Sequence, residues 1–325
     1  MWAFRLFGLA ITLATALLAV PAQAQQKVTL KLGHLANEQD VWHQAALKFG
    51  EELKALSNGS MEVQVFPNES LGKEMDLING MQLGTVDMTI TGESLQNWAP
   101  SAALLAIPYA LTSLEQLDKV AGGPIGEKIA AEVIQKARVR PIAYFARGPR
   151  NLTSNRPITK PEDLNGFRMR VPNVPLFVAV WKELGARPTP MAFSEVFTAL
   201  QNNTIEGQEN PLALIKAANF NEVQKYVNRT EHVRSWIYLV IGERRFQSLT
   251  KEQQDAVIEA GKRAQAYERK LFLEAEQKLE DELKARGMTF VDVDIAAFAA
   301  KARPAALAAV KPEVKPMLEE ILAMQ

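Results

Sequence analysis

Residues 150–211 read RNLTSNRPITKPEDLNGFRMRVPNVPLFVAVWKELGARPTPMAFSEVFTALQNNTIEGQENP. This stretch places two arginines, Arg150 and Arg170, among loop and turn residues that are otherwise short of catalytic groups. A guanidinium group stays charged at any relevant pH and binds a carboxylate through two parallel hydrogen bonds. The stretch therefore indicates a site that holds an anion rather than one that converts it.

One short strand is predicted within this stretch. Apolar and basic residues alternate over 167–171, so the apolar side chains share one face of the strand while Arg168 and Arg170 share the other. Pro172 follows directly and ends the strand, which leaves Arg170 near its carboxyl end. Ligands of α/β proteins usually lie at that edge of the sheet. We expect Arg168, farther from the edge, to be a surface residue.

Three runs in this order resemble the solute-binding proteins of tripartite ATP-independent periplasmic (TRAP) transporters. The runs are PEDLNGFRMRVP at 161–172, GARPTPMAFSEVFTALQ at 185–201 and EGQENP at 206–211. The family contains C4-dicarboxylate-binding and sialate-binding members. The resemblance implies an α/β, two-lobed periplasmic binding protein of type II-like fold. Such a protein captures an organic acid, delivers it to membrane permease subunits, and uses neither a cofactor nor a metal.

The resemblance also assigns binding roles to four residues. The arginine of the R-V-P motif holds the ligand carboxylate in the family, which implies this role for Arg170. Arg150 matches a second, variable arginine that contacts the ligand, Asn210 of QENP matches an asparagine that reaches it, and Phe193 matches an aromatic that packs over it. From the residues alone, Arg150 could instead form a structural salt bridge and Phe193 could belong to the core.

Two acidic residues, Glu93 and Glu74, align with ligand-lining positions in the sugar-acid binders of the family. Their oxygens can accept hydrogen bonds from hydroxyls. Glu74 could instead be an ordinary acidic residue at a helix start. The loop after the first strand and the segment EHVRSWIYL at 231–239 add further cleft positions, namely His34, Leu35, Asn37 and Ser235 or Trp236.

These assignments favour one class of ligand. A dicarboxylate would place its second acid near the glutamates, where like charges repel in a poorly solvated site. A monocarboxylate rich in hydroxyls avoids this repulsion, so we favour a hexuronate or related aldonate, such as glucuronate or galacturonate. A C4-dicarboxylate and sialate are the alternative ligands, and a membrane sensor is the alternative partner to a permease.

The N-terminus predicts export. Arg5 precedes the apolar run LFGLAITLATALLAV, which is short for a membrane span, and the small-x-small pattern that ends at Ala24 follows. We expect a signal peptide over residues 1–24, cleaved after Ala24; a membrane anchor is the alternative. The sequence contains no cysteine, which excludes a lipid-modified cysteine and a disulfide framework. The mature protein is expected to be free in the periplasm.

Composition limits the partners. The chain has 37 basic and 37 acidic residues, and only Arg5 is charged within residues 1–24, so the mature chain is nearly neutral. Nothing in this balance attracts nucleic acid or an anionic membrane. Roughly 300 mature residues exceed what one core usually organises, so two lobes with a ligand cleft are expected.

Alternating strand and helix patterns support this organisation. A helical run at 46–56 separates strand patterns at 28–32 and 61–65, which predicts a β-α-β unit. The remaining elements predict a mostly parallel sheet in each lobe; they are strands at 86–90, 140–146 and 238–242 and helices around 75–83, after 174 and from 194. The lobes are expected at 25–148 plus about 236–275, and at 149–235 plus about 276–325.

A long helix is predicted near the C-terminus. Thr250 and Gln253 have capping-box spacing, and Gly287 is placed to end the helix. Unbroken, this helix would be roughly 55 Å long, so we expect it to cross both lobes, with a bend near Gly261. Its apolar residues do not sustain a heptad, which favours a monomer over a dimerising coiled coil.

Enzyme signatures are absent from the sequence. It has no cysteine nucleophile, no GxSxG, no GxxxxGK[ST] and no GxGxxG after a strand, and its three histidines lack metal-ligand spacing. Glu206 and Glu209 resemble a carboxylate pair but are interpreted as solvated loop acids. The alternative of another class is a periplasmic sugar-acid hydrolase or isomerase that uses Glu93 or Glu74 as its base.

Overall fold

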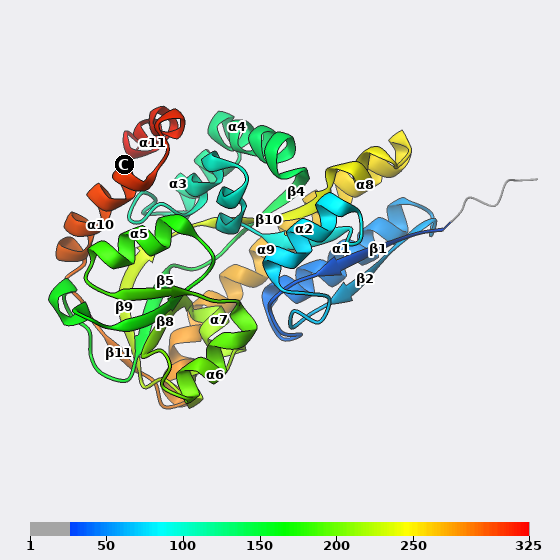
Figure 1. Cartoon of the computed structure of the whole chain (residues 1–325). Helices are drawn as coiled ribbons and strands as arrows, with labels where there is room; N and C mark the ends of the chain where they lie inside the picture. Colours follow the sequence, from blue (N-terminus) through cyan, green and yellow to red (C-terminus); the bar gives the residue numbers. More distant parts are fainter. Residues whose placement is uncertain (1–26, 325) are drawn as a thin grey trace, which may run out of the picture.

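The computed structural model describes residues 27–324, so the predicted signal peptide lies outside the described residues. Two mixed β-sheets, each covered by helices, form two lobes that the chain crosses more than once (Figure 1). The predicted two-lobed α/β fold is confirmed. No helix among residues 27–324 combines the length and the apolar character needed to cross a membrane.

The first lobe contains a five-stranded sheet in the order β2-β1-β3-β10-β4. Its strands are β1 (Val28–Gly33), β2 (Met61–Phe66), β3 (Met88–Thr91), β4 (Val139–Ala146) and β10 (Trp236–Gly242). Helix α1 (Val41–Leu56) connects the parallel strands β1 and β2, as the predicted β-α-β unit requires. The Asp40 side chain caps α1 by accepting a hydrogen bond from Trp42 N.

The second lobe contains a six-stranded sheet in the order β11-β9-β5-β8-β6-β7. Its strands are β5 (Arg150–Ser154), β6 (Arg168–Val171), β7 (Arg187–Pro190), β8 (Gly207–Pro211), β9 (Tyr226–Val233) and β11 (Thr289–Val291). Strand β6 pairs in parallel with β7 and β8. The strand predicted around Arg170 is therefore present and lies inside the sheet.

The expectation of a mostly parallel sheet in each lobe is confirmed, with one strand in each sheet running against the others. Strand β10 is antiparallel to β3 and β4, and β5 is antiparallel to β8 and β9. Both strands enter from the other lobe, β5 through residues 147–149 and β10 through residues 234–235. They are therefore not delivered by the helical crossover that makes neighbouring strands parallel. The residue boundaries of the lobes stay a prediction.

Helices cover both sheets and connect the lobes. Besides α1 they are α2 (Glu74–Leu83), α3 (Leu114–Ala121), α4 (Pro124–Glu132), α5 (Pro175–Glu183), α6 (Val196–Gln201), α7 (Leu212–Ala217), α8 (Glu243–Gln247), α9 (Lys251–Ala285), α10 (Ile295–Ala309) and α11 (Lys315–Leu322). Helix α10 packs against α5. A 3₁₀ turn, Phe193–Glu195, precedes α6, so the helix predicted from Ser194 begins with tighter winding.

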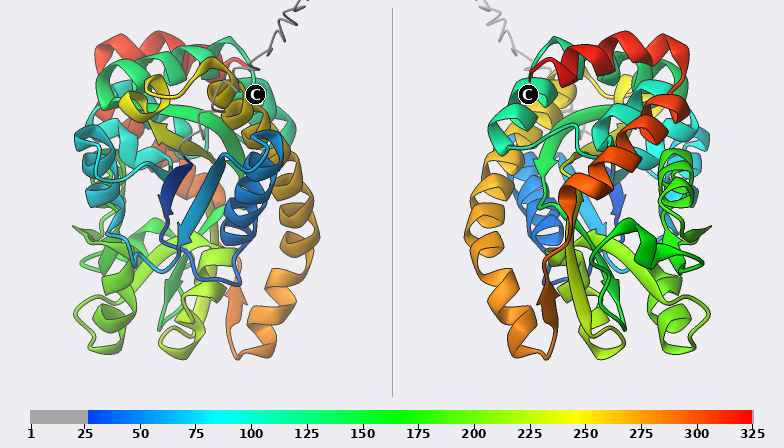
Figure 2. Two further views of the ribbon diagram at one scale, coloured as in Figure 1. Left: turned by 90° about the vertical axis from the view of Figure 1, so that its right-hand side faces the viewer. Right: turned by 90° about the vertical axis from the view of Figure 1, so that its left-hand side faces the viewer.

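The long helix α9 is continuous and contacts both lobes, as predicted. It packs against α1 and β4 in the first lobe and against α7 in the second, and Figure 2 shows it running along one side of the molecule. The capping box of Thr250 and Gln253 is present at its start. A Cβ at Gly261 would lie 2.8 Å from the Ile142 carbonyl oxygen. Glycine at this position therefore allows the close approach of α9 to β4.

Helix α9 carries a buried acid where the lobes meet. Glu268 is 1% exposed, and neither of its carboxylate oxygens has a side-chain hydrogen-bond partner among residues 27–324. It lines a cavity together with Asp40, Arg147 and Glu276. Burial raises the pKa of Glu268 to about 8, against an ordinary value of 4.5. The folded protein therefore keeps this carboxyl protonated at neutral pH.

We predict that Glu268 makes stability depend on pH. Because the folded chain holds a proton that the unfolded chain releases, the free energy of unfolding should fall as pH rises from about 4.5 to about 8. Glu268→Gln should remove on the order of 2–4 kcal/mol of this fall. Urea unfolding at pH 5, 6, 7 and 8 measures it. The exposed Glu274→Gln on the same helix is the control, and identical pH profiles for Glu268→Gln and the wild type would contradict the prediction.

Candidate functional site

A cavity lies between the two lobes and is lined by residues from both. Strands β3, β6 and β8 bring their carboxyl ends to it, through Thr91, Arg170 and Asn210. This is the edge of an α/β sheet at which ligands usually lie. The complete lining consists of Leu35, Trp42, Glu74, Ile90, Thr91, Gly92, Glu93, Ser94, Arg147, Arg150, Arg170, Pro172, Phe193, Asn210, Leu214 and Ile237.

Arg170 is held rigidly at the cavity wall. Its Nε and Nη2 donate hydrogen bonds to the Met191 carbonyl oxygen at 2.9 and 2.8 Å, and the Phe193 ring centroid lies 5.9 Å from its guanidinium carbon. Burial lowers the pKa of Arg170 to about 10, so the side chain remains charged at neutral pH. Its Nη1 has no hydrogen-bond partner among residues 27–324. The guanidinium can therefore donate to an anion in the cavity.

Arg150 lines the same cavity but is already paired. Its Nε and Nη2 donate to the two carboxylate oxygens of Glu209 at 2.5 and 2.7 Å. Burial alone would raise the pKa of Glu209, but the charge and hydrogen bonds of Arg150 outweigh it and hold this pKa at about 2. The interpretation of Glu209 as a solvated loop acid was wrong, because its side chain is 0% exposed. Glu206, by contrast, pairs with Arg168 at the surface.

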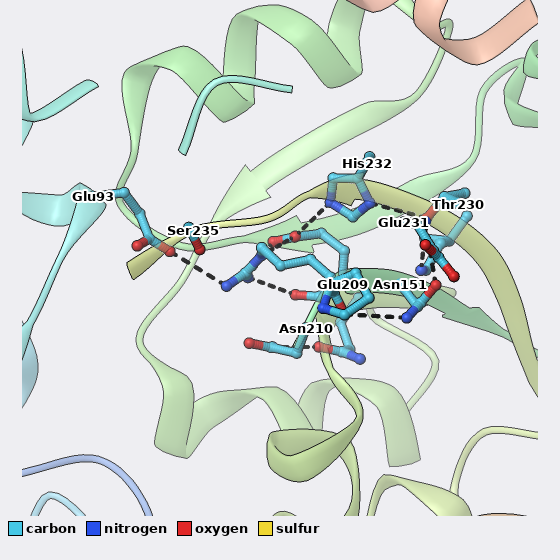
Figure 3. Close-up of polar contacts among 12 residues, drawn as sticks. Glu93, Asn151, Glu209, Asn210, Thr230, Glu231, His232 and Ser235 are labelled. Atoms are coloured by element: carbon cyan, nitrogen blue, oxygen red, sulfur yellow. Dashed lines mark hydrogen bonds and ion pairs between the residues drawn. The ribbon is translucent and has the colours of Figure 1, made fainter. Parts of the chain in front are cut away.

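His232 completes the surroundings of Glu209 (Figure 3). Its Nε2 lies 2.8 Å from a carboxylate oxygen of Glu209, and its Nδ1 lies 2.9 Å from the hydroxyl of Thr230. Burial lowers the pKa of His232, which favours the neutral ring. Since an ionised carboxylate only accepts hydrogen bonds, we assign the ring proton to Nε2. The histidine thus supports the ion pair without adding charge.

Arg147 was missed by the sequence analysis. Its Nε donates to the Ser235 hydroxyl at 2.7 Å, and its Nη2 forms an ion pair with Glu93. Arg147 and Ser235 belong to the two segments through which the chain crosses between lobes, so this bond ties the crossings together. The motif ARGPR at 146–150 was a usable signal, because it places a second arginine three residues before Arg150.

Glu93 lines the cavity as predicted, but its carboxylate is engaged by arginines. It pairs with Arg147 and, at 3.3 Å, with Nη1 of Arg150. Burial opposes ionisation, yet the two guanidinium charges lower the pKa of Glu93 overall. The role of Glu93 as an acceptor for ligand hydroxyls stays a prediction, and the structure adds that both of its oxygens contact arginines. Glu93 cancels positive charge at the cavity wall.

Glu74 sits in a different environment at the start of α2. The hydroxyls of Thr91 and Ser94 donate to its two oxygens at 2.6 and 3.0 Å, and no arginine pairs with it among the described hydrogen bonds. Burial, followed by the negative charge of Glu93, raises the pKa of Glu74. A protonated carboxyl can both donate and accept hydrogen bonds, which suits a ligand hydroxyl.

The structure brings six predicted residues together, namely Arg170, Arg150, Asn210, Glu93, Glu74 and Phe193, together with Leu35. Three weaker candidates do not line the cavity. His34 is buried behind it, 3.1 Å from the ring of His43. Asn37 donates instead to the Ala217 carbonyl oxygen at 2.7 Å. Trp236 is fully buried and packs edge-on against Tyr238.

The cavity offers hydrogen-bond donors and acceptors but no metal centre. Within residues 27–324 no group of three or more His, Cys, Asp or Glu is placed to hold a metal ion. The arrangement can hold an anion, accept and donate hydrogen bonds to hydroxyls, and cover an apolar face with Phe193 and Trp42.

We predict that Glu209 is essential for stability. Glu209→Ala would leave Arg150 buried without its bidentate partner, which should cost about 3–5 kcal/mol of the free energy of unfolding. Glu206→Ala, from the same EGQENP segment but at an exposed ion pair, should cost less than about 1 kcal/mol. Chemical unfolding of both variants measures the difference. Equal stabilities of the two variants would show that the buried ion pair stabilises the fold no more than the exposed one.

The chain matches known proteins over most of its length. The profile of the family described as "Bacterial extracellular solute-binding protein, family 7" matches residues 32–312. A solute-binding protein of Roseobacter denitrificans is 66% identical over 314 residues, which cover 97% of each chain. The 2,3-diketo-L-gulonate-binding periplasmic protein YiaO of Escherichia coli is 34% identical over 273 residues, 83% of each chain.

Solved structures agree with these relationships. The structure of a TRAP periplasmic solute-binding protein from Roseobacter denitrificans with bound L-galactonate superimposes with a TM-score of 0.90 at 67% identity, covering 91% of this chain and 99% of that one. A TRAP periplasmic solute-binding protein from Xanthobacter autotrophicus with bound β-D-galacturonate has a TM-score of 0.87 at 29% identity, covering 90% of this chain and 99% of that one.

Proposed function

Since the chain belongs to family 7 of the bacterial extracellular solute-binding proteins, the periplasmic binding proteins of TRAP transporters, we propose that it captures a six-carbon sugar acid. We further propose that it carries this acid through the periplasm to membrane permease subunits. The family consists of transport proteins, not enzymes, so a catalytic base role for Glu93 or Glu74 is set aside.

The observation that carries the proposal is the charge at the cavity. Arg147, Arg150 and Arg170 contribute three buried positive charges, whereas two ionised carboxylates, Glu93 and Glu209, pair with the first two arginines. Arg170 alone lacks a carboxylate partner among the described ion pairs, and the raised pKa of Glu74 favours its neutral form. One carboxylate on the ligand would neutralise the remaining charge.

A second carboxylate has no partner in this arrangement. It would stand near the ionised Glu93 carboxylate, where repulsion and desolvation both oppose binding. Hydroxyl groups, in contrast, match the Glu74 carboxyl, the Asn210 amide and the Thr91 and Ser94 hydroxyls around the same space. This supports a polyhydroxylated monocarboxylate over a C4-dicarboxylate. The narrow space between these lining residues favours a six-carbon acid over the bulkier sialate.

Among six-carbon acids we favour an aldonate, L-galactonate. The protein with L-galactonate bound is 67% identical to this chain. A hexuronate is the second candidate, because proteins at 29% identity hold galacturonate. This ordering places the aldonate ahead of the hexuronate that the residues alone favoured.

Capture and delivery follow from the two-lobed architecture. The open lobes admit the acid, and Arg170 binds its carboxylate. Contacts with the first lobe form only when the lobes close, so the ligand binds the closed state more tightly and shifts the equilibrium towards it. A signal peptide over residues 1–24 would direct the chain to the periplasm, and cleavage after Ala24 would release it there. The permease would then recognise the closed form.

We predict that Arg170 is required for binding. Arg170→Ala should weaken binding by on the order of 2–5 kcal/mol, because it removes a buried charged donor. Arg170→Lys should fall between Ala and the wild type, since lysine lacks the planar fork. Calorimetry with L-galactonate measures both, and thermal unfolding without ligand checks that the fold survives. Affinity near that of the wild type in Arg170→Ala would rule out this assignment.

Ligand class is tested by a thermal-shift panel followed by calorimetry. L-galactonate should raise the melting temperature most, galacturonate and glucuronate less, and succinate, malate and sialate least, because only the first three combine one carboxylate with a compact set of hydroxyls. Tight binding of succinate without a response to any sugar acid would contradict the proposed function.

A further inference from the structure

An outer cavity adjoins the binding cavity. The two cavities share four lining residues, Glu74, Arg170, Pro172 and Phe193. Arg170 and Phe193 form part of both walls, so the outer cavity lies directly next to the proposed carboxylate-binding position. The outer cavity is therefore the candidate entrance for a ligand.

One segment of the second lobe, residues 191–195, holds Arg170 from this side. The Met191 carbonyl oxygen accepts both hydrogen bonds of the Arg170 guanidinium, and the Phe193 ring lies against it. Ser194 and Glu195 belong to the same 3₁₀ turn as Phe193. A displacement of this turn would therefore move the two supports of the arginine.

A segment of the first lobe, residues 69–73, contacts that turn across the cleft. The Ser194 backbone N–H donates to the Glu69 carboxylate at 3.1 Å, and the Lys73 ammonium lies 2.5 Å from the Glu195 carboxylate. Lys73 is the N-cap residue of α2 and directly precedes Glu74. These contacts therefore lie next to residues that line the binding cavity in both lobes, namely Glu74 and Phe193.

We propose that segments 69–73 and 191–195 form a latch, which closes over the entrance, positions Arg170 and sets how long a ligand stays bound. The identity of the ligand that the latch retains rests on the proposed function. The contacts of the latch join the two lobes and do not depend on which ligand binds. Lys73 and Glu195 act as positioning residues, because neither lines the binding cavity itself.

The expected effect is kinetic and modest. The side chains of Lys73 and Glu195 are 48% and 50% exposed, and an ion pair this exposed contributes little energy. When the lobes open, the pair separates, so its whole contribution falls on the opening step. Loss of the pair should therefore raise the dissociation rate constant about three- to fivefold and leave the association rate constant unchanged.

Stopped-flow kinetics with L-galactonate test the latch. Lys73→Ala, Glu195→Ala and the double variant should show the same increase in dissociation rate, because each removes one shared interaction. The charge-swapped variant, Lys73→Glu with Glu195→Lys, should return towards the wild-type rate. Salt should accelerate dissociation in the wild type and not in the double variant. Lys251→Ala with Asp255→Ala removes an exposed pair within α9 and serves as the control.

Three results would overturn the proposal: an unchanged dissociation rate in the single variants, additive effects in the double variant, or a charge swap no better than the alanines. A cross-linking experiment without ligand distinguishes failure of the latch from failure of the proposed function. Because the chain has no cysteine, Lys73→Cys with Glu195→Cys can be cross-linked with a short bis-maleimide. Because the cross-link is irreversible, it traps every closed state that the ligand-free protein visits, so cross-linking supports the latch even where no sugar acid binds, and its absence contradicts it.

Discussion

The pairing of Arg150 with Glu209 is the constraint on which the rest of the site depends. It joins the first residue of β5 to β8, and both side chains are almost completely buried. An unpaired charge buried this deeply would strongly destabilise the folded state. The two side chains must therefore stay opposite each other, and this fixes the register of the two strands at the cleft. His232 and Glu93 attach to this pair, and through Glu93 the network reaches Arg147 and the crossing segments.

The same network links the two lobes at the cleft. Glu93 belongs to the first lobe and Arg150 to the second, so their contact at 3.3 Å forms between lobes. Arg147 ties the two crossings together through Ser235. Closure thus brings together groups whose charges compensate one another. In the proposed binding mode, a ligand carboxylate at Arg170 would complete this compensation and favour the closed state.

Sequence reasoning recovered the fold and the residues that local patterns can reveal. Alternation placed β6 and Arg170, and a capping box placed α9. It could not place Glu209 correctly, because burial of an acid depends on a partner 59 residues away. Arg147 was missed for the same reason, since its partners Glu93 and Ser235 come from distant elements. The antiparallel direction of β10 and β5 could not be predicted, because the segments that cross between the lobes leave no periodic pattern in the sequence. Pairings between distant charges therefore remain the part of the site that only a structure supplies.

With Arg147 and Arg150 paired to Glu93 and Glu209, the proposed site takes one further negative charge, at Arg170. Galactonate and galactarate test it most directly, because they share the six-carbon hydroxylated chain and differ by one carboxylate. Calorimetry of both acids at neutral pH should show galactonate binding at least about a hundredfold more tightly, in line with a repulsion of several kcal/mol. Equal affinity for the two acids, or a preference for galactarate, would contradict the account.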